Sequence, residues 1–376
     1  MRIGRVLRVA VWLCVVTGLG LTAGCAATAT VANRAGASNS ADVGKAKAIV
    51  AAAEVVPKFI GPGSSVNGAA LRGKTVWIVS AGQAVPFNVS IVNGVKAACA
   101  ALGCKTVVFD GQESLSQWGR GVSEAVAAKA SAIIMPSISP SLVTSEVEQA
   151  VTDKIPVVDL FSETQSAPVS AGAFAHVSIS YVQSGRIQAA YVVAASKGNA
   201  GVIAIADNEF PSEVARVNGG IVPELHSLCS KCSVNVVEQA AGTMQSDLGS
   251  KISSALAAHP GADYVMAAYD AQVTYALPGI VQAGEAHTVK VVGADAVNLS
   301  QVRAKGEEVA DVGEPLVWAG WGAVDEVLRA LKGRPAADEH IPVRLFVATN
   351  IGSSLSESAL FGGSYKSHYL KLWDVK

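Results

Sequence analysis

The cysteines are the residues whose spacing says most about chemistry in this chain. Four of them form two close pairs, Cys99 with Cys104 and Cys229 with Cys232. Such a pair can be a local disulfide, half of a metal site or, as Cys-x-x-Cys, a redox centre. A metal site needs four ligands, and no histidine lies near either pair in the sequence. A redox centre needs an active-site turn between a strand and a helix, whereas Cys229 and Cys232 fall in a predicted loop between a helix and a strand. We therefore interpret both pairs as structural disulfides.

Residue types that often carry catalysis are present without a recognisable pattern. Six histidines are scattered along the chain, and they do not have the spacing of a metal site or of a catalytic triad. The chain also lacks a nucleophile elbow, a glycine-rich phosphate loop and a dinucleotide fingerprint. We therefore predict that the protein is not an enzyme and that it has no catalytic residue, no metal site and no cofactor.

The first 25 residues have the layout of an export signal. Three arginines within the first eight residues precede an uncharged run, residues 9–21, which is followed by small residues. A basic start, a short apolar core and a small-residue cleavage region mark a signal peptide. The apolar core is shorter than the roughly 20 residues that span a bilayer. The sequence therefore predicts export, with residues 1–24 as the signal peptide.

The end of this segment, Thr22-Ala23-Gly24-Cys25, resembles the bacterial lipobox. One position departs from that motif, because the usual leucine three residues before the cysteine is Thr22 here and Leu21 lies one residue further back. The resemblance implies that Cys25 is acylated and anchors the exported protein to the outer face of the cytoplasmic membrane. The alternative is an ordinary secreted protein in which Cys25 has no such role.

Composition limits the remaining classes of function. The chain has 376 residues, enough for two domains of ordinary size after the signal is removed. Its formal net charge is −1, so no basic excess favours nucleic acid as a partner. Half of the residues are hydrophobic, but no uncharged run after the signal is long enough to cross a membrane.

Strands and helices alternate from Lys74 onward. Short apolar runs such as "KTVWIVS", "AIIMP" and "GVIAIAD" have the composition of strands buried on both faces. Helical patterns separate them, which is typical of parallel sheets with helices on both sides. The alternation restarts at Gly201, so we predict two α/β lobes. Before them, residues 25–72 are predicted to be a lipid-anchored tether with a short helix at residues 43–55.

The strand ends indicate where a ligand would bind. In open parallel sheets, ligands bind outside the carboxyl ends of the strands. Two lobes whose strand ends face each other form a cleft there, lined by the residues just past each strand. These candidate segments are residues 80–88, 110–112, 136–139, 161–163, 207–210, 269–271 and 295–298.

Several segments, in this order and spacing, resemble the type I periplasmic binding proteins, which are ribose- and galactose-binding-like and serve ABC importers. The resemblance covers residues 74–350. It includes "WIVSAGQAVPFNVSIVNGVKAACAALG", similar to the family's first strand, turn and helix, and "AIIMPSISPSLVTSEVEQAVTDKIPVVDL", similar to its third strand, helix and fourth strand. "VSISYVQSGRIQAAYV" resembles the first crossover, "AAYDAQVTYALPGIVQAG" and "VKVVGAD" the late strands, and "ADVGEPLVWAGWGAVDEVLRALKG" the return to the first lobe.

The resemblance implies a fold of two Rossmann-like, doubly wound lobes that close on a ligand by hinge motion. It implies three crossings between the lobes, near Ser180, Glu314 and Arg344. The N-terminal lobe then comprises residues 73–179 and 315–343, and the C-terminal lobe residues 180–314 and 344–376.

The ligand positions depart from those of the family's sugar binders. Aromatic side chains, namely Phe161, Tyr181 and Tyr269, stand where the family carries polar ones, and its first asparagine is Val85 here. The arginine of the second lobe aligns with Val217 or, one residue earlier, with Arg216. Phe87 and Asp295 are kept, and the last glutamine aligns with Glu314. The resemblance therefore implies a ligand set of Gln83, Phe87, Asn88, Phe161, Tyr181, Arg216, Tyr269, Asp270, Asp295, Glu314 and Trp318.

A pocket rich in aromatic groups and poor in hydrogen-bonding groups favours a larger or less hydroxylated solute than a simple sugar. We expect Asp295 and Glu314 to accept hydrogen bonds from it; the alternative for Asp295 is a cap on the following helix. We therefore expect a monomeric solute-binding lipoprotein that captures a small sugar-like or aromatic solute and delivers it to ABC permease subunits. A sensor lipoprotein that signals to a membrane receptor and an exported enzyme are the alternatives.

Overall fold

The computed structural model describes residues 35–375, with side chains from residue 42 onward. The predicted signal peptide, the predicted acylation site Cys25 and the start of the predicted tether lie outside the described residues. Within residues 35–375, no helix combines the length and the apolar character that crossing a bilayer requires.

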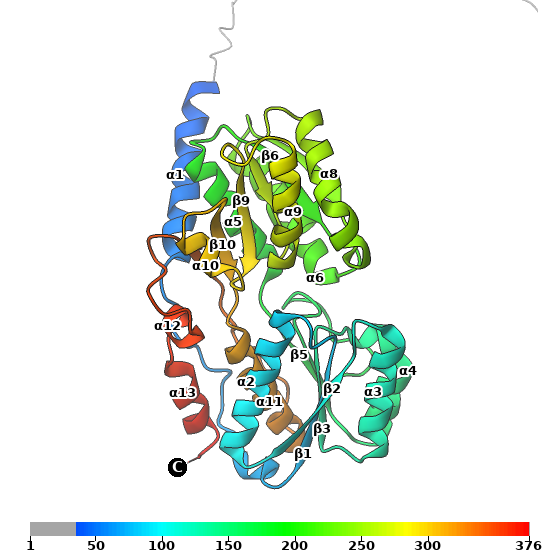
Figure 1. The fold of residues 1–376 in the computed structure, drawn as a ribbon. Coiled ribbons are helices and arrows are strands. Elements are labelled where there is room, and N and C mark those ends of the chain that lie inside the picture. The colour runs from blue at the N-terminus through cyan, green and yellow to red at the C-terminus, as the bar shows by residue number, and fades with distance from the viewer. Residues whose placement is uncertain (1–34, 376) are drawn as a thin grey trace, which may run out of the picture.

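The first lobe is built on a five-stranded parallel sheet in the order β2-β1-β3-β4-β5. Helices α2 and α11 cover one face of this sheet, and α3 and α4 cover the other (Figure 1). All side chains of β3 and β4 are buried, as their apolar runs predict. The elements of this lobe are η1 (Gly68–Leu71), β1 (Thr75–Ser80), α2 (Pro86–Leu102), β2 (Lys105–Asp110), α3 (Leu115–Ala127), β3 (Ala132–Pro136), η2 (Pro140–Val143), α4 (Thr144–Thr152), β4 (Val157–Leu160), β5 (Ala175–Val177) and α11 (Leu316–Leu331).

The second lobe has six strands in the order β11-β10-β9-β8-β6-β7, which are parallel except that β11 runs antiparallel to β10. Helices α5 and α7 pack on one face of the sheet, and α8 and α9 on the other. Its elements are α5 (Tyr181–Ala195), β6 (Gly201–Ala206), α6 (Pro211–Val214), η3 (Ala215–Ile221), α7 (Val222–Leu228), β7 (Ser233–Glu238), η4 (Ala241–Thr243), α8 (Met244–Ala258), β8 (Tyr264–Met266), α9 (Asp270–Gln282), β9 (Lys290–Asp295), α10 (Leu299–Arg303), β10 (Glu308–Gly313) and β11 (Arg344–Val347).

Between β1 and β11 the chain passes from one lobe to the other three times. Ser180 lies in the first crossing and caps α5, because its Oγ accepts a hydrogen bond from the Gln183 N–H. Glu314 lies in the second crossing, between β10 and α11, and Arg344 opens β11 after the third. The predicted fold class, two α/β lobes with parallel sheets joined by a three-segment hinge, is confirmed.

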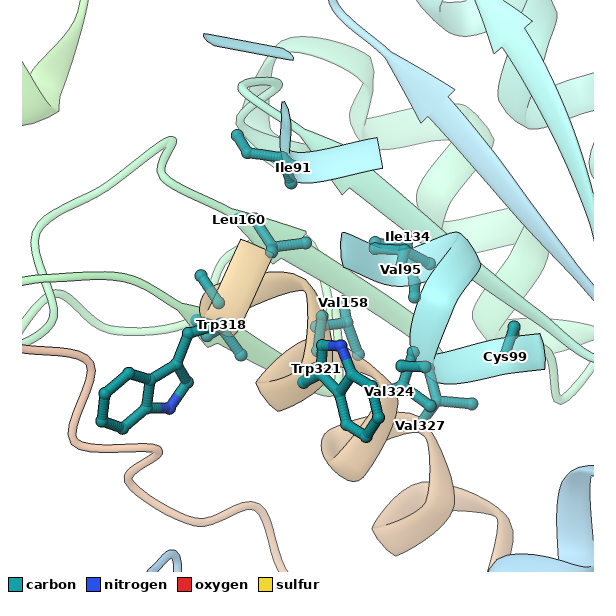
Figure 2. Packing of buried hydrophobic residues seen from close by; sticks show 14 of the residues in the cluster. Ile91, Val95, Cys99, Ile134, Val158, Leu160, Trp318, Trp321, Val324 and Val327 are labelled. Carbon is teal, nitrogen blue, oxygen red and sulfur yellow. The ribbon is translucent and has the colours of Figure 1, made fainter. Parts of the chain in front are cut away.

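Helix α11 returns from the second lobe and completes the core of the first. Figure 2 shows its buried side chains packed among those of α2 and β4. The helices approach closely at two glycines: a Cβ on Gly94 would lie 2.5 Å from the Val317 carbonyl oxygen, and one on Gly320 would lie 2.6 Å from the Val95 nitrogen. This backbone contact fixes the start of α11, and with it the position of Glu314 just before the helix.

Each predicted cysteine pair is joined in the structure by a disulfide bond. One bond links Cys99, in the last turn of α2, to Cys104, just before β2. The other links Cys229 to Cys232 in the connection from α7 to β7. Both bonds close very short loops, at the amino ends of β2 and β7.

The N-terminal segment packs against both lobes. Helix α1 (Ala35–Ala53) lies along α5 and α7 of the C-terminal lobe (Figure 1), where Ala46 is buried in the core. Further on, Val66 and Leu71 are buried in the core of the N-terminal lobe. Residues 25–72 are predicted from the sequence to be a tether, whereas the described part of this segment is largely docked, because its apolar side chains find buried positions on each lobe.

The C-terminal segment also divides between the lobes. Helix α12 (Glu357–Phe361) packs with Phe346 of the C-terminal lobe, whereas α13 (Ser364–Leu372) packs on α11 of the N-terminal lobe. The sequence-based division places residues 344–376 in the C-terminal lobe. The difference arises from an aromatic stripe, Tyr365, Tyr369 and Trp373, which is buried against the tryptophans of α11.

Candidate functional site

The N-terminal lobe brings two phenylalanines to the edge that faces the other lobe. Phe87 lies in the first turn of α2, which Pro86 can open because proline lacks an N–H that the first turn would leave unpaired. Phe161 follows β4 with a positive φ of 55°, which turns the chain at the strand end. The two rings pack edge to face, with centroids 5.5 Å apart, and form an apolar wall there.

Arg216 is the central charged residue on the C-terminal side. Its side chain is fully buried, and its Nη1 donates to the carbonyl oxygen of Ala268, just past β8. Its Nη2 donates to the Glu314 carboxylate in the second crossing, and Nη1 lies 3.5 Å from Oδ1 of Asp295, at the end of β9. The guanidinium therefore lies at the carboxyl ends of the strands, where this architecture binds ligands.

Tyr181 connects this cation to the N-terminal lobe. Its ring lies under the guanidinium, with the Arg216 Cζ 4.7 Å from the ring centroid. Its hydroxyl donates to the carbonyl oxygen of Phe161 at 3.3 Å. A chain of contacts thus runs from Phe87 through Phe161 and Tyr181 to Arg216, and it joins the two lobes across the site.

A π-helical segment decides which residue reaches the site. Residues 215–221 form a π-helix, and Pro223, which cannot donate a backbone hydrogen bond, is the second residue of the helix that follows. A π-helix contains more residues per turn than an α-helix, so the side-chain register shifts along the segment. As a result Arg216 points to the strand ends, while Val217 is buried in the core of the lobe. Of the two residues that the sequence left open, Arg216 is therefore the one whose side chain reaches the strand ends.

A glycine brings the π-helix close to α5. A Cβ on Gly185 would lie only 2.1 Å from the Arg216 carbonyl oxygen. No other residue type permits this approach of two helical backbones. The contact holds the backbone of Arg216 at a fixed place beside the sheet.

Three carboxylates surround the guanidinium. Glu314 and Asp295 contact it as described, and Oε2 of Glu213 lies 3.7 Å from Nη1. Burial raises the pKa of Glu213 and of Glu314 to about 7, although Arg216 opposes the shift. Burial disfavours the charged guanidinium, but Glu213 and Glu314 outweigh it and raise the pKa of Arg216, so Arg216 stays a cation.

Several polar atoms of this cluster have no hydrogen-bond partner among the described residues. They are Nε of Arg216, Oε2 of Glu213 and Oε2 of Glu314. Buried polar atoms are nearly always paired, and an unpaired one costs about 1–3 kcal/mol. The cluster can therefore offer one donor and two acceptors to a polar group bound at the site.

Asp295 does not cap the helix that follows it. Helix α10 begins at Leu299, and its N-cap Asn298 makes no side-chain capping bond. Instead, Oδ2 of Asp295 accepts from the N–H of Asp270, the first residue of α9, at 3.4 Å. Asp295 also has a φ of +107°, which is unusual for a residue with a side chain. The carboxylate therefore faces Arg216 and the start of α9.

Other predicted ligand residues hold the surrounding loops. The amide of Asn88 donates to Gly82 O and accepts from Ser137 Oγ, so both of its ends are engaged. Gln83 Nε2 donates to Ser80 Oγ at 2.7 Å. Asp270 Oδ2 accepts from the N–H groups of residues 297 and 298 and braces the loop after β9. These three residues thus shape the site through its loops.

Tyr269 and Trp318 differ in their placement. Tyr269 precedes α9, and its hydroxyl donates to Oδ2 of Asp207 at 2.9 Å, at the end of β6. Trp318 is 1% exposed and stacks on Tyr365 and Phe59 in the core of the N-terminal lobe. Figure 2 shows its ring on the far side of α11 from Val95 and Cys99. We remove Trp318 from the proposed ligand set, because that face of α11 packs on α13.

Glu213 is a member of the cluster that the sequence-based ligand set does not contain. It lies three residues before Arg216, a spacing that places two side chains on one helix face. That pairing is the signal that could have identified it. Asp207, buried beside Tyr269, lies in the candidate segment 207–210 but also outside the ligand set.

Comparison with known proteins agrees with this architecture. A family model described as a periplasmic binding protein domain matches residues 76–335. No curated protein sequence matches the chain. Among solved structures, an ABC transporter solute-binding protein from Agrobacterium vitis with bound allitol has a TM-score of 0.63 at 19% identity, covering 74% of this chain and 96% of its own.

Two further solved structures are similar over the same region. A glucose-galactose binding protein from Geobacillus stearothermophilus has a TM-score of 0.65 at 17% identity, covering 74% of this chain and 99% of its own. An ABC transporter solute-binding protein from Bacillus halodurans with bound myo-inositol has a TM-score of 0.64 at 18% identity, covering 74% and 96%. The family model spans more than half of this chain, and the chain therefore belongs to the type I periplasmic binding protein family.

Proposed function

We propose that the protein is an extracytoplasmic solute-binding lipoprotein that captures a small solute between its lobes and delivers it to an ABC importer. One observation carries this proposal. The Arg216 cluster, with its unpartnered polar atoms, lies at the strand ends of one lobe, and the wall of Phe87 and Phe161 lies at the strand ends of the other. Similar folds that carry bound allitol and myo-inositol support binding rather than catalysis.

The site favours a solute with a ring or an apolar face and a few hydroxyl or amine groups. The phenylalanine wall offers stacking, and the carboxylates of Glu213, Asp295 and Glu314 accept hydrogen bonds. Three carboxylates around one guanidinium disfavour an anion.

The two disulfides support export, since such bonds persist in oxidising compartments.

A thermal-shift screen of polyols, sugars, nucleosides and aromatic amines tests the function. A true ligand raises the melting temperature in a dose-dependent way, because it binds the folded state alone. No dose-dependent shift with any of these classes would contradict solute binding of the proposed kind. Titration calorimetry then gives the affinity of the ligand that the screen identifies.

Asp295→Asn is expected to weaken binding of that ligand by up to roughly a hundredfold, or about 1–3 kcal/mol, because the amide replaces one acceptor oxygen of the carboxyl group by an N–H donor and leaves a buried donor on the solute unpaired. Calorimetry on the variant and on Asp153→Asn, an exposed residue beyond α4, measures the effect. Unchanged affinity in Asp295→Asn, with lowered stability, would assign Asp295 a purely structural role.

Membrane anchoring is tested at Cys25. Cys25→Ala should release the protein from the membrane into the soluble exported fraction, because a protein without its acyl chains has no hydrophobic anchor. Fractionation followed by immunoblotting measures the distribution. Retention of the variant in the membrane fraction, equal to that of the unchanged protein, would refute the lipoprotein proposal and leave solute binding untouched.

A further inference from the structure

Three carboxylates meet behind the Arg216 cluster in the C-terminal lobe. They belong to Asp270, at the start of α9, and to Glu308 and Asp311 on β10. Each side chain offers one oxygen, and these oxygens all lie within 4.8 Å of one another. Asp270 is 2% exposed, and Glu308 and Asp311 are fully buried. Of the three, only Asp270 belongs to the ligand set expected from the sequence, because the residues are far apart in the chain and form no motif.

Several oxygens of this cluster have no partner. Both carboxylate oxygens of Glu308 and Oδ1 of Asp270 are buried without a hydrogen-bond donor among the described residues. Across the same part of the chain, none of the three carboxylates forms an ion pair with lysine, arginine or histidine. Ionised carboxylates buried without counter-charge cost several kcal/mol each, so the cluster must hold either protons or a bound cation.

The sheet leaves room for these oxygens at Gly293. This residue of β9 pairs with Asp311 of β10. A Cβ on Gly293 would lie 2.3 Å from Oε1 of Glu308 and 2.6 Å from Oδ1 of Asp270. The missing side chain therefore creates the space into which the two unpartnered carboxylate oxygens converge.

Backbone donors hold the carboxylates in this arrangement. The N–H groups of Val297 and Asn298 donate to Oδ2 of Asp270 at 2.7 and 2.8 Å, which leaves Oδ1 of the same group directed at Glu308. The Ala296 N–H donates to Asp311 at 3.1 Å. These donors come from the loop after β9, whose Val297 is exposed, so the cluster lies directly under a surface loop.

We propose that Asp270, Glu308 and Asp311 bind a hard divalent cation of the Ca²⁺ or Mg²⁺ type. Carboxylate oxygens without sulfur or imidazole select such ions over zinc or copper. Ligand oxygens about 2.1–2.6 Å from an ion lie up to roughly 5 Å from one another, as they do here. The inference contradicts the sequence-based prediction of no metal site, and it does not rest on the identity of the solute.

A second buried acidic cluster differs from the first because an arginine of the chain supplies its counter-charge. Asp325, Glu326 and Glu339 also lie within 4.8 Å of one another, in the N-terminal lobe. There, however, Arg329 forms ion pairs with Asp325 and Glu326, and Trp373 donates to Asp325. Oε2 of Glu326 and Oε1 of Glu339 are unpartnered among the described residues there as well, but the chain itself supplies a positive charge to this cluster through Arg329, which makes Glu326 a matched control for Glu308.

The test uses the exported full-length protein after EDTA treatment, titrated with CaCl₂ and separately with MgCl₂ at constant ionic strength set by KCl. We expect one ion to bind at a single site by calorimetry and to raise the melting temperature, while KCl alone does not. Glu308→Gln should weaken binding of that ion by about 100-fold or more, since even indirect support of a metal ligand is worth 10–100-fold. Glu326→Gln, which instead removes the buried carboxylate beside Arg329, should bind the ion like the unchanged protein.

Asp311→Asn provides a second variant in case Glu308→Gln does not fold, and it should show the same loss of ion binding. The proposal is overturned if the EDTA-treated protein binds neither Ca²⁺ nor Mg²⁺ and melts at the same temperature with and without them. In that case the carboxyl groups share protons instead. It is equally overturned if Glu308→Gln and Asp311→Asn bind the ion as tightly as the unchanged protein does.

Discussion

Replacement of Arg216 by methionine is expected to destabilise the folded protein by about 3–5 kcal/mol, the usual cost of removing one partner from a buried ion pair. Methionine fills much of the same volume but leaves Glu213, Asp295 and Glu314 facing one another without a cation. It also removes the donor to the Ala268 carbonyl oxygen and the contact with the Tyr181 ring. The free energy of unfolding, from urea denaturation, measures the effect.

Two further variants make this prediction specific to the buried charge. Arg120→Met removes an exposed ion pair with Glu124 and should change stability by less than about 1 kcal/mol, as exposed pairs do. Combining Arg216→Met with Glu314→Gln should recover part of the loss, because one unpaired carboxylate is then neutral. If Arg216→Met and Arg120→Met lower the free energy of unfolding by equal, small amounts, the positive charge of Arg216 does not stabilise the three carboxylates.

The stability of the N-terminal lobe should fall as the pH rises, and Asp159 should contribute strongly to that fall. Burial raises the pKa of this carboxyl from 3.8 to about 7, although the Ser162 hydroxyl and His176 oppose the shift and Glu163 adds to it. Between pH 4 and 7 the folded state therefore holds a proton that the unfolded state has lost, so stability decreases with pH in this window and levels off above it.

The size of this effect is up to about 4 kcal/mol, since one pKa unit corresponds to about 1.4 kcal/mol. Asp159→Asn keeps the shape of the side chain without its charge. The stability difference between the variant and the unchanged protein should grow in favour of the variant from pH 4 to 7, as followed by urea denaturation. Asp153→Asn, on the surface, should show no such growth; a flat difference for Asp159→Asn would contradict the raised pKa.

The order of strands and helices could be predicted from the sequence because the local residue composition of each element indicates whether it is a strand or a helix. The run "GVIAIAD" has no polar residue before its final aspartate, so neither face of the strand is suited to water, and β6 is buried at every position. The predicted crossings near Ser180, Glu314 and Arg344 coincide with the element ends in the structure. The ends of strands and helices depend on residues that are neighbours in the chain, so they can be predicted from the sequence.

Side-chain register within a helix was harder to predict. The alignment could not decide between Arg216 and Val217, since a π-helix changes the direction of side chains without any change in composition. The sequence predicts Trp318 at the ligand site, but the face of α11 that it occupies is covered by α13. In both cases the deciding contact comes from a segment distant in sequence.

The sequence by itself determined the two α/β lobes, the hinge crossings and the strand ends where we propose that a ligand binds, because apolar runs, turn residues and their order are local properties of the chain. Only the tertiary structure decided that Arg216 faces three carboxylates, and that Asp270, Glu308 and Asp311 converge over Gly293. Those groups lie on different strands and helices. Their charges and unpaired oxygens interact strongly only after folding has removed them from water and placed them within a few ångströms of one another.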